Sequence, residues 1–226
     1  MKPLGKVLLV DLDLTLIDSL RGMYVAFIST LSDRRSEIPD LSSRSFVIEY
    51  YENDLSRYIN DKEFPERWRF WNEMWRRYVM NAGFYGTPFK CVHDTLRALK
   101  GRYYIVITTG REIASRDIKE ELRRSGIRDL VHEVYSVGDL GIYKRKTDLY
   151  MHLMSRFKSL GFNPENMVVI SDSYRDLLNA EKFGMSGVGF VPEGLEVVEE
   201  YFRRHGIRYF SSWCSYRELE SYLEKI

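Results

Sequence analysis

The feature that most constrains the fold is a repeated alternation of short apolar runs with helical patterns. The apolar runs lie at residues 7–12, 103–107, 133–137, 167–170, 187–190 and, more weakly, 207–210. Runs so short and so rich in Val, Ile and Leu are typical of strands buried on both faces. Helical patterns follow at residues 113–125, 147–160, 173–183, 193–205 and 216–225, and the first four end at a glycine. The sequence therefore predicts an α/β fold, a Rossmann-like parallel sheet with helices on both faces.

Residues 19–86 interrupt this rhythm, because they contain amphipathic helical patterns and no convincing buried strand. Trp68, Trp71, Trp75 and Tyr78 share one helix face, which indicates the core of a small helical bundle or one wall of a substrate pocket. Glycines and a proline at 83–88 indicate a return linker. We therefore expect a helical cap domain at 19–86 and an α/β core domain at 1–18 and 87–226.

Composition excludes several classes of protein. The 226 residues are 44% hydrophobic and 30% charged, which excludes a disordered chain. A net charge of +1 gives no electrostatic reason to expect binding to nucleic acid or to a membrane surface. No apolar run is long enough to span a bilayer, and the amino terminus lacks the pattern of a signal peptide. We expect a cytoplasmic protein, either a monomer or a homodimer.

The cysteines and histidines indicate neither a disulfide nor a zinc site. Cys91 and Cys214 lie far apart in the sequence, and a reducing cytoplasm favours two free thiols. The four histidines have no spacing typical of zinc ligands. The absence of glutamine together with abundant charged residues is typical of thermophilic proteins.

Acidic residues follow two of the predicted strands. Asp11 and Asp13 end the first run, where two carboxylates are costly to bury unless a cation offsets their charge. Asp172 ends the run at 167–170, and Asp176 comes one helical turn later, so both carboxylates can face one point. Such hard oxygen ligands suit Mg²⁺. Since the carboxyl ends of parallel strands share one edge of a sheet, we expect the four side chains to meet there.

A hydroxyl-rich turn follows the second core strand. Thr108 or, if the strand register differs by one residue, Thr109 ends this strand, and Gly110 follows it. A hydroxyl and the free N–H groups of a helix start can both donate to a phosphate oxygen. Taken alone, the segment is better explained as an ordinary helix cap.

Taken in order, these segments resemble the motifs of the haloacid dehalogenase superfamily. The sequence Asp11-Leu-Asp-Leu-Thr15 resembles the first motif of its phosphatase branch, in which phosphoglycolate phosphatase-like members carry a helical cap after the first strand. Thr108 matches the second motif, and Ser171-Asp-Ser-Tyr-Arg-Asp176 resembles the fourth. The third motif is a lysine near a helix start. Lys144 is our choice, because the predicted helix start at Thr147 then falls where the family's helix usually starts. Lys146 is the alternative, since this chain lacks the proline that usually follows the lysine.

The resemblance implies a reaction. Asp11 would attack phosphorus and form an aspartyl-phosphate, and Asp13 would act as general acid and base. Asp11, Asp172 and the backbone carbonyl of Asp13 would hold Mg²⁺, with Asp176 supporting it.

Thr108 and Lys144 would bind the phosphoryl oxygens, and Thr109 and Gly110 would contact the substrate, a small phosphorylated metabolite. Alternatives are a phosphomutase, or a binding or regulatory protein that retains the site. A receiver-type signalling domain fits less well, since its phosphorylated Asp follows a middle strand. Five arginines of the cap region have no assigned role: Arg21, Arg67, Arg69, Arg76 and Arg77.

Overall fold

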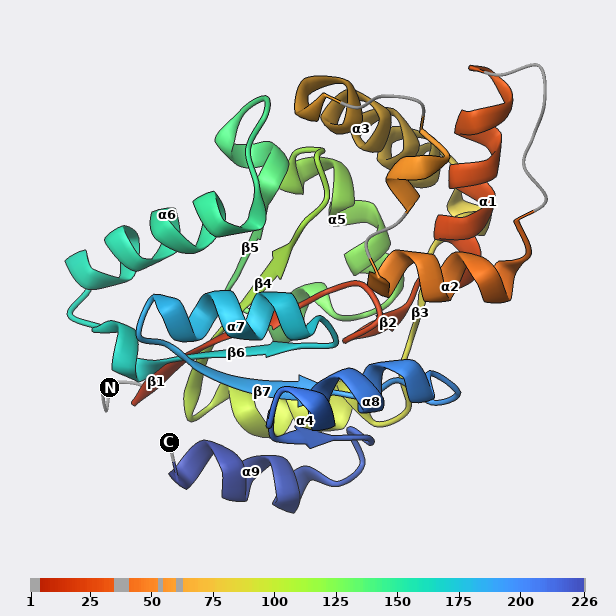
Figure 1. Ribbon diagram of the computed structural model, residues 1–226. Coiled ribbons are helices and arrows are strands. Elements are labelled where there is room, and N and C mark those ends of the chain that lie inside the picture. The colour runs from red at the N-terminus through yellow and green to blue at the C-terminus, as the bar shows by residue number, and fades with distance from the viewer. Residues whose placement is uncertain (1–4, 35–40, 53–54, 60–62, 226) are drawn as a thin grey trace.

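Six strands form a parallel sheet in the order β5-β4-β1-β6-β7-β8. The structure is a computed structural model that describes residues 5–34, 41–52, 55–59 and 63–225 (Figure 1). The predicted α/β fold is confirmed, and each strand matches one apolar run to within three residues. The strands are β1 (Lys6–Asp11), β4 (Tyr103–Thr109), β5 (Glu133–Ser136), β6 (Met167–Ser171), β7 (Ser186–Phe190) and β8 (Tyr209–Phe210).

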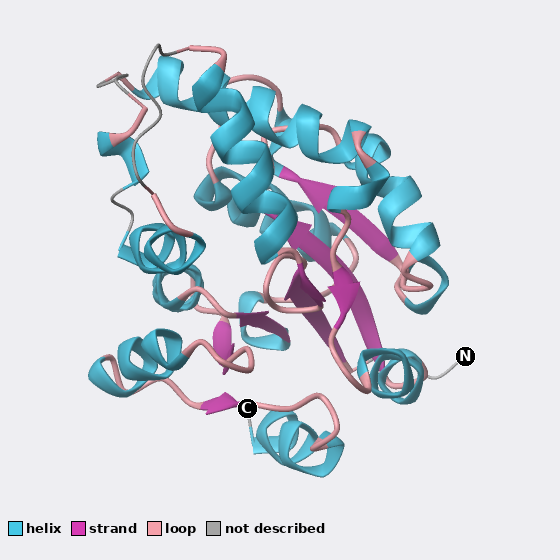
Figure 2. Ribbon diagram, turned by 90° about the vertical axis from the view of Figure 1, so that its right-hand side faces the viewer, coloured by secondary structure: helices cyan, strands magenta, loops and turns pink. Residues whose placement is uncertain are grey.

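Helices cover both faces of this sheet (Figure 2). Leu8 and Val10 of β1 belong to the hydrophobic cluster that includes α4, α5 and α9, whereas Val7 and Leu9 belong to the cluster that includes α6, α7 and α8. Side chains alternate between the two faces of a strand, so a strand buried on both sides must be apolar throughout. The helices are α4 (Val92–Lys100), α5 (Ser115–Arg124), α6 (Lys146–Ser159), α7 (Tyr174–Lys182), α8 (Glu196–Arg204) and α9 (Tyr216–Lys225).

The sequence did not reveal α4. This helix has nine residues, and the residue at its amino-terminal cap, Cys91, has a φ of 66° and makes no capping hydrogen bond. Neither a capping side chain nor a long periodic pattern therefore marks its start. Its buried face consists of Val92, Thr95, Leu96 and Leu99.

Three further helices lie together beyond the carboxyl ends of the strands, in the region predicted to form a cap (Figure 1). They are α1 (Leu20–Ser32), α2 (Ser43–Glu52) and α3 (Phe64–Met80). Phe27 of α1 joins them, because its ring centroid lies 5.3 Å from those of both Phe46 on α2 and Phe70 on α3. Aromatic burial of this kind dominates the stability of a small helical cluster.

A short two-stranded antiparallel sheet, β2 (Ile17–Asp18) with β3 (Thr87–Pro88), joins the two ends of this helical region. These strands coincide with both predicted domain boundaries. We propose that they are the connection about which a cap of residues 19–86 would move. Strands of two residues carry no recognisable alternation, which is why the sequence showed only a linker.

The prediction of two free thiols was wrong, because Cys91 and Cys214 form a disulfide with their Cα atoms 5.0 Å apart. The prediction depended only on compartment and sequence separation, and neither reveals which segments the fold brings together. The bond links the start of α4 to the segment before α9.

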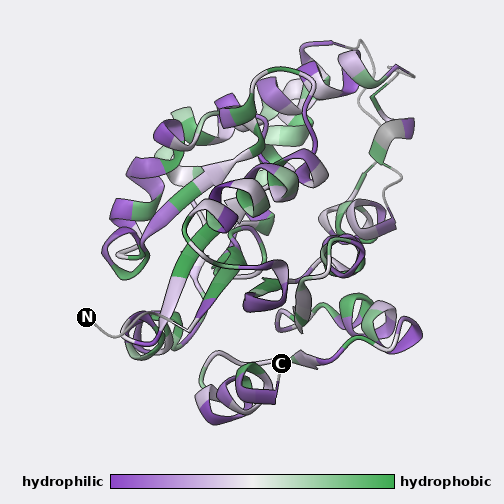
Figure 3. Cartoon of the chain, turned by 90° about the vertical axis from the view of Figure 1, so that its left-hand side faces the viewer, coloured by the Kyte–Doolittle hydropathy of each residue, from purple (hydrophilic) through white to green (hydrophobic). Residues whose placement is uncertain are grey.

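Hydrophobic residues concentrate along the central strands, as the hydropathy colouring in Figure 3 shows. Of the helices that the structure describes, none combines the length and the apolar character that crossing a bilayer requires.

Candidate active site

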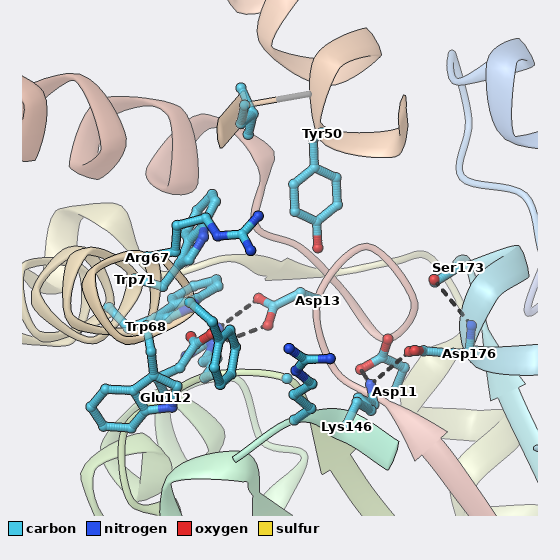
Figure 4. A pocket seen from close by; sticks show the side chains of 16 residues that line it. Asp11, Asp13, Tyr50, Arg67, Trp68, Trp71, Glu112, Lys146, Ser173 and Asp176 are labelled. Carbon is cyan, nitrogen blue, oxygen red and sulfur yellow. Dashed lines mark hydrogen bonds and ion pairs between the residues drawn. The ribbon is translucent and has the colours of Figure 1, made fainter. Parts of the chain in front are cut away.

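The predicted acidic residues converge at the carboxyl edge of the sheet, beneath α2 and α3 (Figure 4). Asp11 is the last residue of β1, and Ser171, the last residue of β6, donates a hydrogen bond to Asp11 Oδ2 at 3.0 Å. The backbone N–H of Leu12 donates to Asp11 Oδ1 at 2.9 Å. These bonds hold the Asp11 carboxylate at the end of its strand. The turn that follows contains Leu14 with a φ of 54°, an uncommon conformation that a functional loop can retain.

Lys146, and not Lys144, is the lysine that the fold brings to this cluster. Its Nζ lies 2.7 Å from Asp11 Oδ1 and 3.0 Å from Asp176 Oδ2. Lys144 is exposed and does not line the cavity. The choice of Lys144 assumed that the helix starts at Thr147. In the structure α6 starts one residue earlier, at Lys146 itself, which turns this side chain toward Asp11.

Asp172 follows β6 and has a hydrogen-bond donor on each carboxylate oxygen. Thr15 donates to Oδ1 at 2.8 Å, and Tyr51 of α2 donates to Oδ2 at 2.7 Å. The backbone N–H of Asp172 in turn donates to Thr15 Oγ1 at 3.0 Å. Tyr51 therefore connects the predicted cap directly to an expected metal ligand.

The Asp11–Asp172 pair carries more negative charge than its surroundings neutralise. Burial, opposed by Lys146, raises the pKa of Asp11 to about 6. Burial and the charge of Asp11 raise the pKa of Asp172 to about 8. Both shifts indicate that the ionised forms lack a compensating positive charge. A divalent cation would supply it.

The available ligands suit Mg²⁺, which keeps several water ligands, better than a metal ion whose ligands all come from protein side chains. Among the residues that the structure describes, no group of three or more His, Cys, Asp or Glu side chains is arranged to hold a metal ion. Mg²⁺ commonly uses one or two carboxylates and takes its other ligands from water and substrate phosphate. Asp11 and Asp172 supply two such carboxylates.

Asp13 is bound by an arginine to which the sequence analysis gave no role. Arg111, fully buried, donates from Nε to Asp13 Oδ2 at 2.9 Å and from Nη2 to Asp13 Oδ1 at 2.7 Å. Burial alone would raise the pKa of Asp13, but the Arg111 guanidinium outweighs burial and lowers it. The Asp13 carboxyl is thus held in its ionised form.

Arg111 itself is fixed by groups from the core and from α3. It donates to Glu121 Oε2 at 2.6 Å, and its guanidinium carbon lies 4.5 Å from the ring of Trp75 and 4.6 Å from that of Tyr78. Tyr78 also donates to Glu121 Oε1 at 2.6 Å. A guanidinium in contact with two aromatic rings gains cation–π stabilisation from each of them. Arg111 therefore links Asp13 to the predicted cap.

The two threonines at the end of β4 have different surroundings. Thr108 pairs with Asp11 across the sheet, so both side chains leave the same face, and its buried Oγ1 has no hydrogen-bond partner. Such an unsatisfied donor is available to an incoming oxyanion. Thr109 instead donates to Asp13 Oδ2 at 3.3 Å and accepts from the N–H of Arg111. Gly110 lines the cavity.

A cavity of about 510 Å³ connects this cluster to the helices above it (Figure 4). Asp11, Asp13, Lys146 and Asp176 line one part, while Asp172 lies outside the lining. Much of the remaining wall is aromatic or basic. It comprises Tyr50, Leu55, Phe64, Arg67, Trp68, Trp71, Trp75, Gly110, Arg111, Glu112, Arg145 and Ser173.

Sequence reasoning missed Tyr51, Arg111, Thr15 and Ser171 as partners of the acidic residues. Thr15 and Ser171 stand inside recognised motifs, where a hydroxyl beside an acid was a usable signal. Tyr51 and Arg111 belong to no such pattern. Their contacts form only when the tertiary structure brings α2 and the turn after β4 close to the ends of β1 and β6. Three of the four residues of the aromatic stripe face the active site, since Trp68, Trp71 and Trp75 line the cavity.

The fold and site together define an α/β protein with acidic residues clustered at the carboxyl edge of a parallel sheet. The profile of the family described as haloacid dehalogenase-like hydrolase matches residues 8–190. The chain belongs to this family.

A phosphoglycolate phosphatase from Aquifex aeolicus is 26% identical over 190 residues, which cover 79% of this chain and 81% of that protein. Among solved structures, a protein named a predicted phosphatase from Clostridium acetobutylicum has a TM-score of 0.74 at 18% identity and covers 99% of this chain and 100% of its own. The HAD-hydrolase YfnB from Bacillus subtilis, solved with bound magnesium, has a TM-score of 0.56 at 16% identity over 89% of this chain and 99% of its own.

Proposed function

We propose that this hydrolase is a Mg²⁺-dependent phosphomonoesterase that acts on a small phosphorylated metabolite through an aspartyl-phosphate on Asp11. The observation that carries the proposal is the position of Asp11. It lies at the end of a central strand, it forms an ion pair with Lys146 at 2.7 Å, and it forms part of the cavity wall. A carboxylate so exposed to a ligand can act as a nucleophile toward phosphorus.

Phosphoryl transfer depends mainly on positioning and charge stabilisation. Asp11 attacks the phosphorus atom, and the leaving oxygen departs on the opposite side. The ammonium of Lys146 and the free hydroxyl of Thr108 donate hydrogen bonds to the phosphoryl oxygens as charge develops on them. The N–H groups of the turn at Gly110 lie at the same edge and can contribute further donors.

Asp13 transfers a proton in each half of the reaction. Its low pKa suits the second half of the reaction, in which it accepts a proton from the water that hydrolyses the aspartyl-phosphate. In the first half it must carry a proton to the leaving alcohol, so a weaker contact with Arg111 is required at that stage. Motion of α3, which supplies Trp75 and Tyr78, is the natural way to weaken it.

Asp11, Asp172 and the backbone carbonyl of Asp13 would hold Mg²⁺, with Asp176 supporting the site through Lys146 or water. When bound, the ion supplies positive charge to the buried carboxylates and to the phosphoryl group. The raised pKa values of Asp11 and Asp172 support this assignment. We further propose that the enzyme works in the cytoplasm as a monomer or homodimer.

The test is phosphate release from para-nitrophenyl phosphate by the wild type and Asp11→Asn, with Mg²⁺ and with EDTA. Turnover that needs both Mg²⁺ and Asp11 is the expected result. A variant that keeps more than about a tenth of wild-type activity would contradict the nucleophilic role, since lost nucleophiles cost far more. Transfer to a second sugar phosphate without release of phosphate would identify a phosphomutase instead.

A further inference from the structure

The cavity contains two arginines whose charge no acid of its lining neutralises. Lys146 is paired with Asp11 and Asp176, and Arg111 is paired with Asp13 and Glu121. Arg67 and Arg145 also line the cavity.

Within the described part of the chain, neither Arg67 nor Arg145 forms an ion pair. The Nε atom of Arg67 is buried and has no hydrogen-bond partner. A buried donor without a partner costs free energy, which a ligand acceptor would recover.

Glu112 does not supply the missing negative charge. It is the fourth acid of the lining, and one oxygen of its buried carboxyl has no hydrogen-bond partner. Burial raises its pKa to about 8, so it is mostly neutral at pH 7. A neutral carboxylic acid does not repel an anion and can itself donate a hydrogen bond.

Arg67 lies on the side of the leaving alcohol. In the view of Figure 4, Asp13 lies between Arg67 and Asp11, and the side chains of Arg67 and Tyr50 extend from the helices toward Asp13. Since Asp13 is the proton donor for the leaving oxygen, groups beyond it contact the alcohol and not the phosphoryl group. The second anion that Arg67 would bind therefore belongs to the alcohol.

The wall around Arg67 is aromatic. Phe64, Trp68 and Trp71 of α3 line the cavity with Tyr50 of α2, and the guanidinium carbon of Arg145 lies 4.2 Å from the ring of Phe64. Flat side chains of this kind favour a planar, apolar ligand body. A volume of about 510 Å³ lies in the range of pockets for ring-sized organic ligands and greatly exceeds what a two-carbon acid fills.

We propose that the substrate is a phosphomonoester whose alcohol carries an aromatic or similarly planar body and a second anionic group, a carboxylate or another phosphate. Arg67, assisted by the exposed Arg145 beside Phe64, binds the second anion, and the aromatic wall of α3 and Tyr50 binds the planar body. This assignment rests on the proposed phosphatase function, because it takes the position of Asp13 as the marker of the leaving group.

The test uses four probes that vary the ring and the acid separately. They are ethyl phosphate, phosphoglycolate, benzyl phosphate and 4-carboxybenzyl phosphate. We expect kcat/KM to be highest for 4-carboxybenzyl phosphate and lowest for ethyl phosphate. Arg67→Met should lower kcat/KM for the two acidic probes about 10- to 100-fold, the range for loss of a charge-assisted hydrogen bond, and at most about 3-fold for the neutral ones.

Two further variants provide controls. Arg67→Lys retains the charge and should restore part of the preference for the acidic probes. Arg76→Met removes an exposed arginine of the same helix that lies outside the cavity, and it should leave all four values unchanged. An Arg67→Met variant that loses activity equally toward all four probes would overturn the inference and leave the phosphatase function intact.

Equilibrium binding tests the proposed role of Arg67 in substrate recognition independently of the proposed phosphatase activity. 4-Carboxybenzylphosphonate and benzylphosphonate are analogues that cannot be hydrolysed, and calorimetry with the wild type and Arg67→Met measures recognition without turnover. Tighter binding of the acidic phosphonate that disappears in Arg67→Met supports the inference even if no probe is hydrolysed. Equal binding of the two phosphonates to the wild type would refute it.

Discussion

Replacing Lys146 by methionine tests the assignment that depends most on the structure. Lys146 Nζ lies 2.7 Å from Asp11 and 3.0 Å from Asp176, and its side chain is only 12% exposed. Removing one partner of such a buried pair should lower the free energy of unfolding by about 3 kcal/mol. It also removes a positive charge next to the phosphoryl group, a loss typically worth about 10²- to 10³-fold in kcat.

The same substitution should change the pH dependence. Lys146 lowers the pKa of Asp11, which burial raises to about 6. Without the ammonium this pKa rises further, so the nucleophile becomes ionised only at higher pH, and the acidic limb of the activity profile moves upward.

Lys144→Met is the matched control, because Lys144 is an exposed lysine two residues away. The assay is Mg²⁺-dependent phosphate release from para-nitrophenyl phosphate between about pH 5 and pH 9, with thermal unfolding as a check on folding. Lys144→Met should stay within about twofold of the wild type, as expected for a surface change. If Lys144→Met lost activity and Lys146→Met kept it, the assignment would be refuted.

Three further outcomes are expected. Since the pKa of Asp172 is raised from 3.8 to about 8, its contribution to stability is full below about pH 4 and is lost as the pH rises through about 8. In EDTA the melting temperature should therefore fall over this range and recover with Mg²⁺. Asp172→Asn, which leaves Asp11 and Glu112 with raised pKa values, should show a smaller fall, and a flat wild-type profile would contradict the reasoning. Tyr51→Phe removes the donor to Asp172 Oδ2 and should weaken Mg²⁺ binding about tenfold by calorimetry, whereas an unchanged Kd would exclude this contact from metal binding. Reducing the Cys91–Cys214 bond, which closes a loop of 123 residues, should lower the free energy of unfolding by up to about 5 kcal/mol, and a reductant should have no effect on the melting temperature of Cys91→Ser.

The fold could be predicted because its signals are local. The central strands of the parallel sheet, such as β1 and β6, are buried on both faces, so each appears as an uninterrupted apolar run such as residues 7–10. Four helices end where expected, next to Gly126, Gly161, Gly184 and Gly206, all of which have positive φ. Both the apolar runs and the glycines at helix ends can be recognised in the sequence without knowledge of the tertiary structure.

The acidic residues of the site could also be predicted, because their placement follows from strand ends alone. The choice between Lys144 and Lys146 could not, since a shift of one residue in the start of α6 decides which ammonium faces Asp11. The ion pair between Arg111 and Asp13 could not be predicted from the sequence either. It requires Glu121 and two aromatic rings of α3 to surround the guanidinium, and these residues come from separate elements.

The central claim is that Asp11 carries the phosphoryl group during turnover. The most direct measurement is mass spectrometry of Asp13→Asn after acid quenching of its reaction with para-nitrophenyl phosphate and Mg²⁺. This substrate has a leaving group that needs no proton donor, while the missing base slows hydrolysis of the intermediate. We predict one added phosphoryl group on the peptide that contains Asp11, and none when Asp11→Asn is added to the variant. A phosphoryl group on another residue, or an unmodified protein that still releases para-nitrophenol, would contradict the account.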